Sequence, residues 1–553
     1  SSVNCINSYT ITEVQTLLPN FITFTKMSSE NLAKLYKNTG KSEDSRRRRT
    51  ETSVELRKKK CNEEMMKRRN INLECADDST TSAEELVTDG EIGEPTGRLS
   101  PEMLSLEDAV EVLQKEQNAE RFRLAFESVR RVLSRSKCPP IDKVITLGFP
   151  CALVQALHYD DDKVKFEAAW CITNIVSGTS EQTMTMVNAG AVGPLLKLCS
   201  SPSLKLSEQA VWCIANMAGD GVQLRDLLIS EGILPLLVGL ADRADTLGIS
   251  FVRILTWAFS NLCRHKKPQV PLQMLAVMAP SISKLIKYED TTTQTDATWA
   301  LSYLTDGNDD NISLGMGCLS DMVTFISSGH DSLIAPALRV LGNFVTGSDE
   351  QTQAVIDTGI LSGAIAQLML SNSTTFVKDC CWLISNVLAG NTSQIQDVID
   401  AQLLPILLSV LQKGEHRLQN EAGWAISNLC CGGTANQIIE ICRVKNGVEA
   451  ICDCLITKNN ELTLNMLESL RSVLRTVAQT DPENLDRIRD RVEECDGVDH
   501  LETLQQHESE QIYSNVFKII EEFFSEDENE GLEMKGDVQP QNQAIQQKPL
   551  FEF

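Results

Sequence analysis

Aromatic residues are scarce in this chain of 553 residues, at 5% of positions, and long apolar runs are missing. No run approaches the roughly 20 apolar residues of a membrane-spanning helix, so we expect no membrane insertion. The 18 cysteines form no C-x-x-C pair, and the 6 histidines lack metal-ligand spacing. These patterns argue against a disulfide framework or a zinc site, so we expect no metal and no cofactor. They favour buried free thiols in a reducing compartment, at Cys171, Cys213, Cys380, Cys381, Cys430 and Cys431.

The chain also lacks the sequence motifs of common enzyme classes. It has no phosphate-binding glycine loop, no nucleophile elbow and no pair of carboxylates placed for acid–base catalysis. Gly315-Met-Gly317 and Gly432-Gly433 are expected to be turns between helices. We therefore predict a protein that is not an enzyme and has no catalytic residues.

All six tryptophans return at a nearly constant spacing. They lie at positions 170, 212, 257, 299, 382 and 424, and one further position in the series carries Arg339. The successive steps are 42, 45, 42, 40, 43 and 42 residues. A period in the forties is typical of helical solenoids of the armadillo or HEAT type. The chain length fits such an array, because a single globular core rarely grows so large.

Each tryptophan has a partner four positions later, which a helix places on the same face. We call the resulting series the Trp/Asn ladder: Trp170/Asn174, Trp212/Asn216, Trp257/Asn261, Trp382/Asn386 and Trp424/Asn428, with Trp299/Tyr303 and Arg339/Asn343 departing from the pattern. Stacked repeats would align these pairs along one concave surface. We expect that surface to be separate from the core, which is assigned to small apolar residues such as Ala169, Ile172 and Ile175.

The chemistry of the ladder favours binding of an extended basic peptide. An Asn side chain has one acceptor and two donors, which match the unpaired groups of a peptide backbone. Parallel Trp rings accept the aliphatic stems of Lys and Arg, with a cation–π attraction of about 0.5–2 kcal/mol each. The alternative is structural, with Trp as a stacking wedge and Asn as a helix-terminal hydrogen bond. For a single pair that alternative is favoured, whereas six aligned copies favour peptide binding.

Charge is distributed unevenly. The chain has a net charge of −25, yet residues 46–69 hold eleven Lys or Arg against four Glu, a net of +7 that leaves −32 for the rest. Such a basic arm would bind nucleic acid, a membrane or an acidic protein, including its own body. The ladder favours self-binding, and the acidic body argues against direct nucleic-acid binding. A polar acidic linker follows the arm, and about 33 flexible residues span roughly 30–35 Å.

Several short motifs follow one another in a specific order. They are residues 46–60 with Lys67-Arg-Arg-Asn70, then Ser177-Gly-Thr-Ser-Glu-Gln-Thr183, Ala218-Gly-Asp220, Ser260-Asn-Leu-Cys-Arg264, Ser302-Tyr-Leu-Thr-Asp-Gly307 and residues 336–347. Over about residues 27–530 this series resembles the importin alpha (karyopherin alpha) family of nuclear-import adapters. The resemblance implies an all-α, right-handed superhelical solenoid of about ten armadillo repeats, with a flexible N-terminal arm. The first repeat would lie near residues 104–159 and the last two near residues 462–479 and 510–524.

The resemblance also divides the chain. It implies an importin-beta-binding domain at residues 27–72, an acidic flexible linker at 73–103, the solenoid at 104–525 and an acidic, polar tail at 526–553. Residues 1–26 do not resemble the family and are expected to be a disordered extension, because Met27 resembles a natural start. Residues 11–24 lack the charged flank and cleavage pattern of a signal peptide.

Two binding sites for nuclear localisation signals follow from the resemblance. The major site would use Trp170, Asn174, Ser177, Gly178, Thr183, Gln209, Trp212, Asn216, Asp220, Trp257 and Asn261, with Gly178, Thr183 and Asp220 around a lysine. The minor site would use Val345, Thr352, Trp382, Ser385, Asn386, Glu421, Trp424 and Asn428. Asp296, Trp299, Tyr303, Arg339 and Asn343 would separate the two sites. Ile254 stands where the family usually has Asn, which implies the loss of one polar contact.

The implied function is that of an import adapter for monopartite and bipartite signals. The arm residues expected to bind importin beta or to inhibit the chain itself are Arg46, Arg47, Arg48, Arg49, Arg57, Lys58, Lys67, Arg68 and Arg69. The cluster 67–69 would occupy the major site until importin beta takes the arm. The C-terminal repeats would bind an export receptor of the cellular apoptosis susceptibility (CAS) type. The protein would shuttle between cytoplasm and nucleus, as a monomer or in an autoinhibited self-association.

Two other functions remain open from the residues alone. One is an armadillo-repeat scaffold that binds basic peptides outside import, in retention or assembly. The other is a scaffold of adhesion or transcription complexes, but those line the solenoid with Lys and Arg for acidic partners, unlike the Trp-lined surface expected here.

Overall fold

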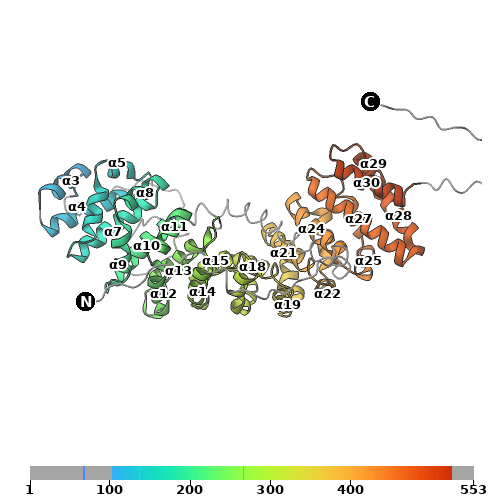
Figure 1. Cartoon of the computed structure of the whole chain (residues 1–553), viewed down its shortest axis with the longest axis horizontal. Helices are drawn as coiled ribbons and strands as arrows, with labels where there is room; N and C mark the ends of the chain where they lie inside the picture. The colour runs from blue at the N-terminus through green and yellow to red at the C-terminus, as the bar shows by residue number, and fades with distance from the viewer. Residues whose placement is uncertain (1–66, 69–102, 117, 136–137, 266, 526–553) are drawn as a thin grey trace, which may run out of the picture. The chain divides into compact units, whose positions relative to one another are not determined.

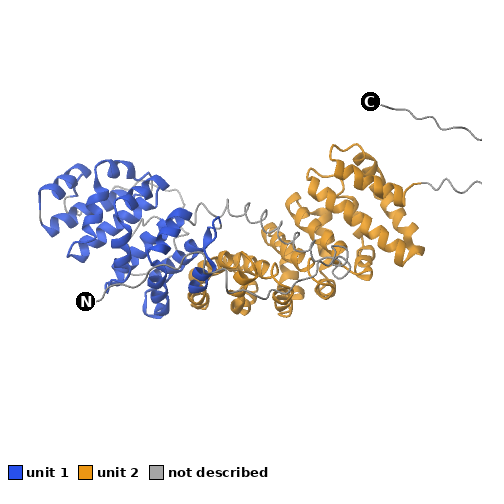
Figure 2. Ribbon diagram, in the orientation of Figure 1, with its two compact units in different colours: residues 1–278 blue, residues 279–553 orange. Residues whose placement is uncertain are grey.

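The computed structural model describes residues 67–68, 103–116, 118–135, 138–265 and 267–525. Across these ranges the regular secondary structure is entirely helical (Figure 1). The predicted extension at 1–26, the arm residues Arg46–Arg49, Arg57, Lys58 and Arg69, nearly all of the linker and the tail at 526–553 lie outside the described residues. The chain divides into unit 1, residues 1–278, and unit 2, residues 279–553 (Figure 2).

Unit 1 is built from α-helices with one short 3₁₀ turn. Its elements are α3 (Leu106–Lys115), α4 (Ala119–Leu133), α5 (Ile141–Thr146), α6 (Phe149–Ala156), α7 (Asp162–Val176), α8 (Ser180–Asn188), α9 (Val192–Cys199), α10 (Leu204–Asp220), α11 (Val222–Ser230), α12 (Ile233–Asp242), η2 (Ala244–Thr246), α13 (Ile249–Arg264) and most of the first half of α14 (Leu272–Ile286).

Unit 2 continues the same kind of array. Its elements are α15 (Thr291–Leu304), α16 (Asp309–Ser313), η3 (Met316–Cys318), α17 (Leu319–Ile326), α18 (Asp331–Phe344), α19 (Asp349–Ile356), η4 (Leu361–Ile365), α20 (Ala366–Met369), α21 (Thr374–Val387), α22 (Thr392–Asp400), α23 (Leu403–Lys413), α24 (His416–Gly432), α25 (Ala435–Arg443), α26 (Gly447–Cys452), α27 (Asn460–Thr480), η5 (Pro482–Asn484), α28 (Leu485–Glu494), α29 (Gly497–Leu504) and α30 (Glu510–Phe523).

The long helices that carry the Trp/Asn ladder, together with α4 before them and α27 after them, pack in chain order within each unit. In unit 1, α4, α7, α10 and α13 pack against one another in succession, and in unit 2 the same holds for α15, α18, α21, α24 and α27. Two shorter helices separate successive long ones, as α8 and α9 do between α7 and α10. This repeat of three helices confirms the predicted all-α armadillo architecture.

A recurring glutamine ties neighbouring repeats together, a feature that the sequence analysis did not anticipate. Each such glutamine completes a capping box at the start of a helix, where its side chain accepts the N–H of the N-cap residue. Its amide also donates to the preceding repeat. The bonds run from Gln182 to Asp142 Oδ1 (2.7 Å), from Gln351 to Asp309 O (3.0 Å), from Gln394 to Asp349 O (2.8 Å) and from Gln437 to Thr392 O (2.8 Å).

The ladder is not separate from the core, so that prediction was wrong. Trp257 and Trp382 are fully buried, as are Asn174, Asn216, Asn261 and Asn386, whereas Trp212, Trp299 and Trp424 are half-buried. The cause is a set of hydrogen bonds between repeats, in which the ladder amide donates to a backbone carbonyl of the preceding repeat. These bonds join Asn216 to Thr173 O (3.2 Å), Asn261 to Ala215 O (2.8 Å), Asn343 to Ser302 O (2.9 Å) and Asn428 to Ser385 O (2.7 Å).

Two further expectations concern cysteines and membranes. Cys171, Cys213, Cys380, Cys381 and Cys430 are buried as predicted, but Cys431 is exposed at the end of α24, against the prediction. Among the described helices, no single one is long and apolar enough to cross a membrane. One pair bent by 82°, Thr392–Asp400 with Leu403–Lys413, meets the length and composition criteria together.

Candidate peptide-binding site

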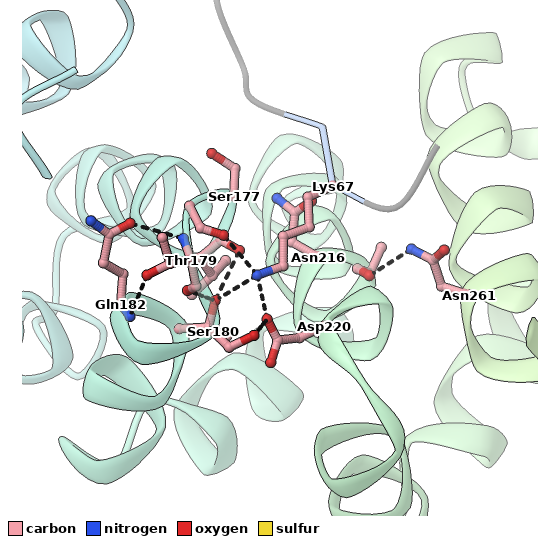
Figure 3. Close-up of polar contacts among 12 residues, drawn as sticks. Lys67, Ser177, Thr179, Ser180, Gln182, Asn216, Asp220 and Asn261 are labelled. Carbon is pink, nitrogen blue, oxygen red and sulfur yellow. Dashed lines mark hydrogen bonds and ion pairs between the residues drawn. The ribbon is translucent and has the colours of Figure 1, made fainter. Parts of the chain in front are cut away.

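The side chain of Lys67 lies against three acceptors, which come from the turn between α7 and α8, from α8 and from α10 (Figure 3). Its Nζ atom donates to Gly178 O and to Thr183 Oγ1, both at 2.9 Å, and forms an ion pair with Asp220 Oδ1. An ammonium has three N–H donors, so each has a partner here. The side chains of Lys67 and Asp220 are only 14% and 9% exposed, so water competes little for these bonds. We call Gly178, Thr183 and Asp220 the lysine site.

Local structure fixes the orientation of two of the three acceptors. The Thr183 hydroxyl donates back to Thr179 O (3.0 Å) or Val176 O (3.2 Å), which leaves its oxygen lone pairs for the ammonium. Gly178 precedes the capping box of Thr179 and Gln182. A Cβ atom at position 178 would lie 2.0 Å from Gln182 Oε1, so the folded-back glutamine requires glycine there. The carbonyl that accepts Lys67 therefore belongs to a residue whose backbone is held by the helix cap.

The backbone of Arg68 is bound by two ladder residues of α10. Asn216 Oδ1 accepts the N–H of Arg68 at 2.8 Å, and Asn216 Nδ2 donates to Arg68 O at 3.1 Å. Trp212 Nε1 donates to the same carbonyl at 2.8 Å. Asn216 Nδ2 also donates to Thr173 O, so one amide both ties the repeats and holds an extended segment. The structural and the peptide-binding explanations of the ladder are thus not exclusive.

The side chain of Arg68 lies over α13. Its Cζ atom is 4.7 Å from the centroid of the Trp257 ring, within the range of a cation–π interaction. Asn261, the partner of Trp257, accepts a hydrogen bond from Arg264. Ile254, one turn before Trp257, is buried at 7% exposure and contributes apolar packing. Ser177 donates to Asn174 O (2.8 Å) within the end of α7, whereas Gln209 of α10 donates to Thr173 Oγ1 of α7 (2.5 Å) and so joins two ladder helices.

Trp170, the first tryptophan of the ladder, is covered by residues that the sequence analysis missed. The guanidinium of Arg130 stacks on its ring, and Arg130 Nε contacts Glu167 Oε2 at 2.5 Å. Asn174 Nδ2 donates to Ser134 Oγ at 3.0 Å. Arg130 and Ser134 lie 40 residues before Trp170 and Asn174, so extending the period backward by one repeat would have found them.

Burial raises the pKa of Glu167, and the charge and hydrogen bond of Arg130 oppose that rise without cancelling it. Arg130 thus stabilises the charged form of the Glu167 carboxyl group. The pair fills one side of Trp170 with side chains of unit 1 itself.

In unit 2 the ladder residues of α18, α21 and α24 form the counterpart. Arg339 lies over the Trp382 ring at 4.7 Å and contacts Asp306 at 3.7 Å. Both polar atoms of the Asn386 side chain are buried and have no hydrogen-bond partner among the described residues, and the same holds for Thr352 Oγ1. Buried polar groups without partners are rare and costly in folded proteins. They are expected where a bound ligand supplies the partner.

The other residues expected near the minor site are distributed over the same helices. Val345 is fully buried at the end of α18, Ser385 donates to Trp382 O at 2.7 Å, and Glu421 is buried in α24. Of the residues expected between the sites, Trp299 and Tyr303 stack with centroids 6.1 Å apart, and Asp296 is buried in α15. The described residues contain no group of three or more His, Cys, Asp or Glu side chains placed to hold a metal ion.

The repeated three-helix units define an armadillo-repeat protein, and comparison with known proteins agrees. A model of the armadillo/beta-catenin-like repeat matches residues 137–177, 179–219 and 391–431, and a model of the atypical Arm repeat matches residues 487–540. A solved engineered protein shares the fold, with a TM-score of 0.67 at 22% identity over 76% of this chain and 99% of that protein.

The comparisons also specify the family. A model of the importin beta binding domain matches residues 33–124. Importin subunit alpha-2 of Caenorhabditis elegans is 44% identical over 509 residues, which cover 92% of this chain and 94% of that protein. Importin subunit alpha-1a of Oryza sativa subsp. japonica is 35% identical over 503 residues, 90% and 92% of the two chains. The chain therefore belongs to the importin alpha family, which confirms the resemblance found in its motifs.

Proposed function

We propose that this chain is a nuclear-import adapter that binds basic localisation signals on its Trp/Asn ladder and links them to importin beta. Residues 27–72 would form the importin-beta-binding domain and residues 104–525 the cargo-binding solenoid, joined by the linker at 73–103. The proposal describes a binding protein and not an enzyme. It rests on the family of the chain and on one set of contacts.

Those contacts are the ones made by Lys67 and Arg68. A lysine ammonium with three acceptors, an arginine backbone held by an Asn amide and a guanidinium over a Trp ring are the interactions that a basic cargo peptide would need. The bonds to the Arg68 backbone do not depend on which side chain the bound residue carries at that position. Another extended Lys-Arg segment would therefore fit the same residues.

The same contacts support competition between the arm and the cargo. A linker of about 31 residues spans roughly 30 Å, so the arm would be present at an effective concentration on the order of mM. Cargo must displace it, and importin beta would remove it by binding the arm. The gain in cargo affinity cannot exceed the free energy with which the tethered arm occupies the site.

Unit 2 supports a second cargo site. Asn386 and Thr352 offer buried polar atoms that have no partner among the described residues, beside the buried Trp382 ring. A bipartite signal would place its second basic cluster there, with Tyr303 and Arg339 between the clusters. We also propose that the C-terminal repeats of unit 2 bind a CAS-type export receptor and that the protein shuttles between cytoplasm and nucleus.

The proposal is tested with the full chain and a fluorescent monopartite basic peptide. The double variant Lys67→Ala/Arg68→Ala should bind the peptide more tightly than wild type, and added importin beta should remove the difference. Asp220→Asn in the same background should weaken binding, because the lysine site loses its charge. Absence of any peptide binding to the double variant would refute the adapter function. Equal binding by wild type and the double variant would refute only the competition.

A further inference from the structure

Ser180 contacts the lysine site without being one of the three acceptors of Lys67. It is the first residue of α8, it is exposed, and its hydroxyl donates to Asp220 Oδ1 at 3.0 Å (Figure 3). The same oxygen receives the ammonium of Lys67. The two residues lie 40 positions apart in neighbouring repeats.

Asp220 needs such a partner because of where it lies. It is the last residue of α10 and is followed by Gly221 in an extended conformation, with φ 167° and ψ 179°. A carboxylate at a helix C-terminus faces the negative end of the helix dipole. The dipole of its own helix therefore does not stabilise the Asp220 carboxylate. Ser180 instead lies at the positive end of α8, so both the hydroxyl and the helix favour a carboxylate at this position.

The position of Asp220 Oδ1 matters for recognition. Gly178 O and Thr183 Oγ1 are fixed by the capping box and by backbone bonds, whereas the Asp220 carboxylate is held by its bonds to Ser180 and Lys67. Three acceptors around one nitrogen match a compact ammonium. A planar guanidinium spreads its donors in a fork and does not fit the same arrangement.

We propose that Ser180 is a positioning residue that holds the Asp220 carboxylate in place for a lysine ammonium. The inference rests on the proposed function and adds to it one residue that does not itself bind the lysine.

Ser180 is not needed to start α8. The N-cap is Thr179, which forms the capping box with Gln182. Helix α25 has the same arrangement, with Thr434 and Gln437 as the box and Ala435 at the position of Ser180. The chain itself thus shows that alanine is compatible with this kind of helix start, and Ser180→Ala should fold normally.

The test uses the full chain carrying Lys67→Ala/Arg68→Ala, so that the arm does not compete. Two peptides are compared, with Lys or Ala at the residue that enters the lysine site. Ser180→Ala should weaken binding of the Lys peptide about three- to tenfold, the scale of a typical net hydrogen bond, because the Ser180–Asp220 bond is exposed to solvent. It should leave binding of the Ala peptide unchanged. Ser180→Thr, which keeps the hydroxyl, should restore binding of the Lys peptide.

A double-mutant cycle with Asp220→Asn separates positioning from a general structural effect. If Ser180 acts through Asp220, Ser180→Ala should add little to Asp220→Asn. The inference would be overturned if Ser180→Ala weakened binding of the Lys and Ala peptides equally. It would also be overturned if Ser180→Ala lowered the midpoint of thermal unfolding, or if it weakened binding of the Lys peptide as much in the Asp220→Asn background as in the parent. Unchanged binding of the Lys peptide to Ser180→Ala would overturn the inference as well. The proposed function is tested separately by the parent chain, which carries Lys67→Ala/Arg68→Ala and keeps Ser180. Tight binding of the Lys peptide to this parent supports the proposed function, and absence of binding to it refutes that function.

Discussion

The guanidinium of Arg130 stacks on the indole of Trp170, with its Cζ atom 4.2 Å from the ring centroid. Arg339 and Trp382 repeat this relationship in unit 2 at 4.7 Å. In both cases the arginine precedes the tryptophan by one repeat, at 40 and 43 residues, and occupies the tryptophan position of the ladder. Each run of tryptophans therefore begins against an arginine of the chain itself, and the covered face is not available to a cargo side chain.

Removing Arg130 should destabilise unit 1 in a pH-dependent way. Burial already raises the pKa of Glu167, and without Arg130 the pKa should rise further. A group whose pKa is higher in the folded state contributes stability at low pH that is lost as the pH rises through the folded value. The deficit of Arg130→Ala relative to wild type should thus be small near pH 5 and grow to about 1–3 kcal/mol near pH 8. Urea unfolding across this pH range measures it.

The matched control is Arg130→Ala/Glu167→Gln. It removes the ionisable group, so the difference from wild type should lose its pH dependence. A deficit of Arg130→Ala that is equal at both ends of the range would contradict the role of Glu167.

Gly178 links the helix cap to the lysine site, and alanine there should disturb both. A Cβ atom would lie 2.0 Å from Gln182 Oε1, so the glutamine must leave its capping position. We expect Gly178→Ala to lower the free energy of unfolding by about 1–2 kcal/mol, the usual value of a lost cap. Basic-peptide affinity should fall as well, because the Gly178 carbonyl moves with the cap. Chemical denaturation and peptide titration test the two effects.

Gly193 provides the control for this substitution. It lies inside α9 with nothing within 4 Å of an added Cβ and no positive φ. Gly193→Ala should stabilise the protein by about 0.5–1 kcal/mol and leave peptide binding unchanged. If the two alanine variants behave alike, the close approach of Gln182 does not explain the glycine at 178.

Gly342 lets the Trp382 ring pack on α18. An added Cβ would lie 1.9 Å from Trp382 Cζ3, inside the ring's own contact distance. Gly342→Ala should cost about 1–3 kcal/mol through overpacking and should quench or shift Trp382 fluorescence. Trp382→Leu should relieve the clash, so the double variant should be more stable than the sum of the single changes predicts. Additive losses would show that the ring can move away at no cost.

The spacing of the tryptophans was enough to predict the repeat, the helix class and the ladder pairs. Extending the period backward by one repeat also reaches Arg130 and Ser134, which the sequence analysis missed because it followed the tryptophans alone. The burial of Asn216 and Asn428 could not be predicted, because helical periodicity shows which residues share a face and not which carbonyl of the next repeat they reach. The contact of Ser180 with Asp220 likewise depends on how α8 packs against α10.

Asn386 and Asn428 occupy equivalent ladder positions but differ in their partners. Asn428 Nδ2 donates to Ser385 O at 2.7 Å, whereas both polar atoms of Asn386 are buried without a hydrogen-bond partner among the described residues. Removing the Asn428 amide loses a buried hydrogen bond between repeats, whereas removing the Asn386 amide loses no hydrogen bond to a described residue. Asn428→Ala should therefore destabilise the protein by about 1–3 kcal/mol.

Asn386→Ala should instead be neutral or stabilising, by up to about 1 kcal/mol after the loss of packing is counted, because a desolvated amide is removed from the folded state. The same variant should bind a bipartite peptide more weakly, because it lacks the amide that would pair with the peptide backbone. A monopartite peptide that uses Trp212 and Asn216 should bind as before. This combination of retained stability and selective loss of binding is what a residue kept for a ligand shows. Thermal unfolding together with titration of both peptides measures it, and a destabilisation as large as that of Asn428→Ala would mean that Asn386 serves the fold.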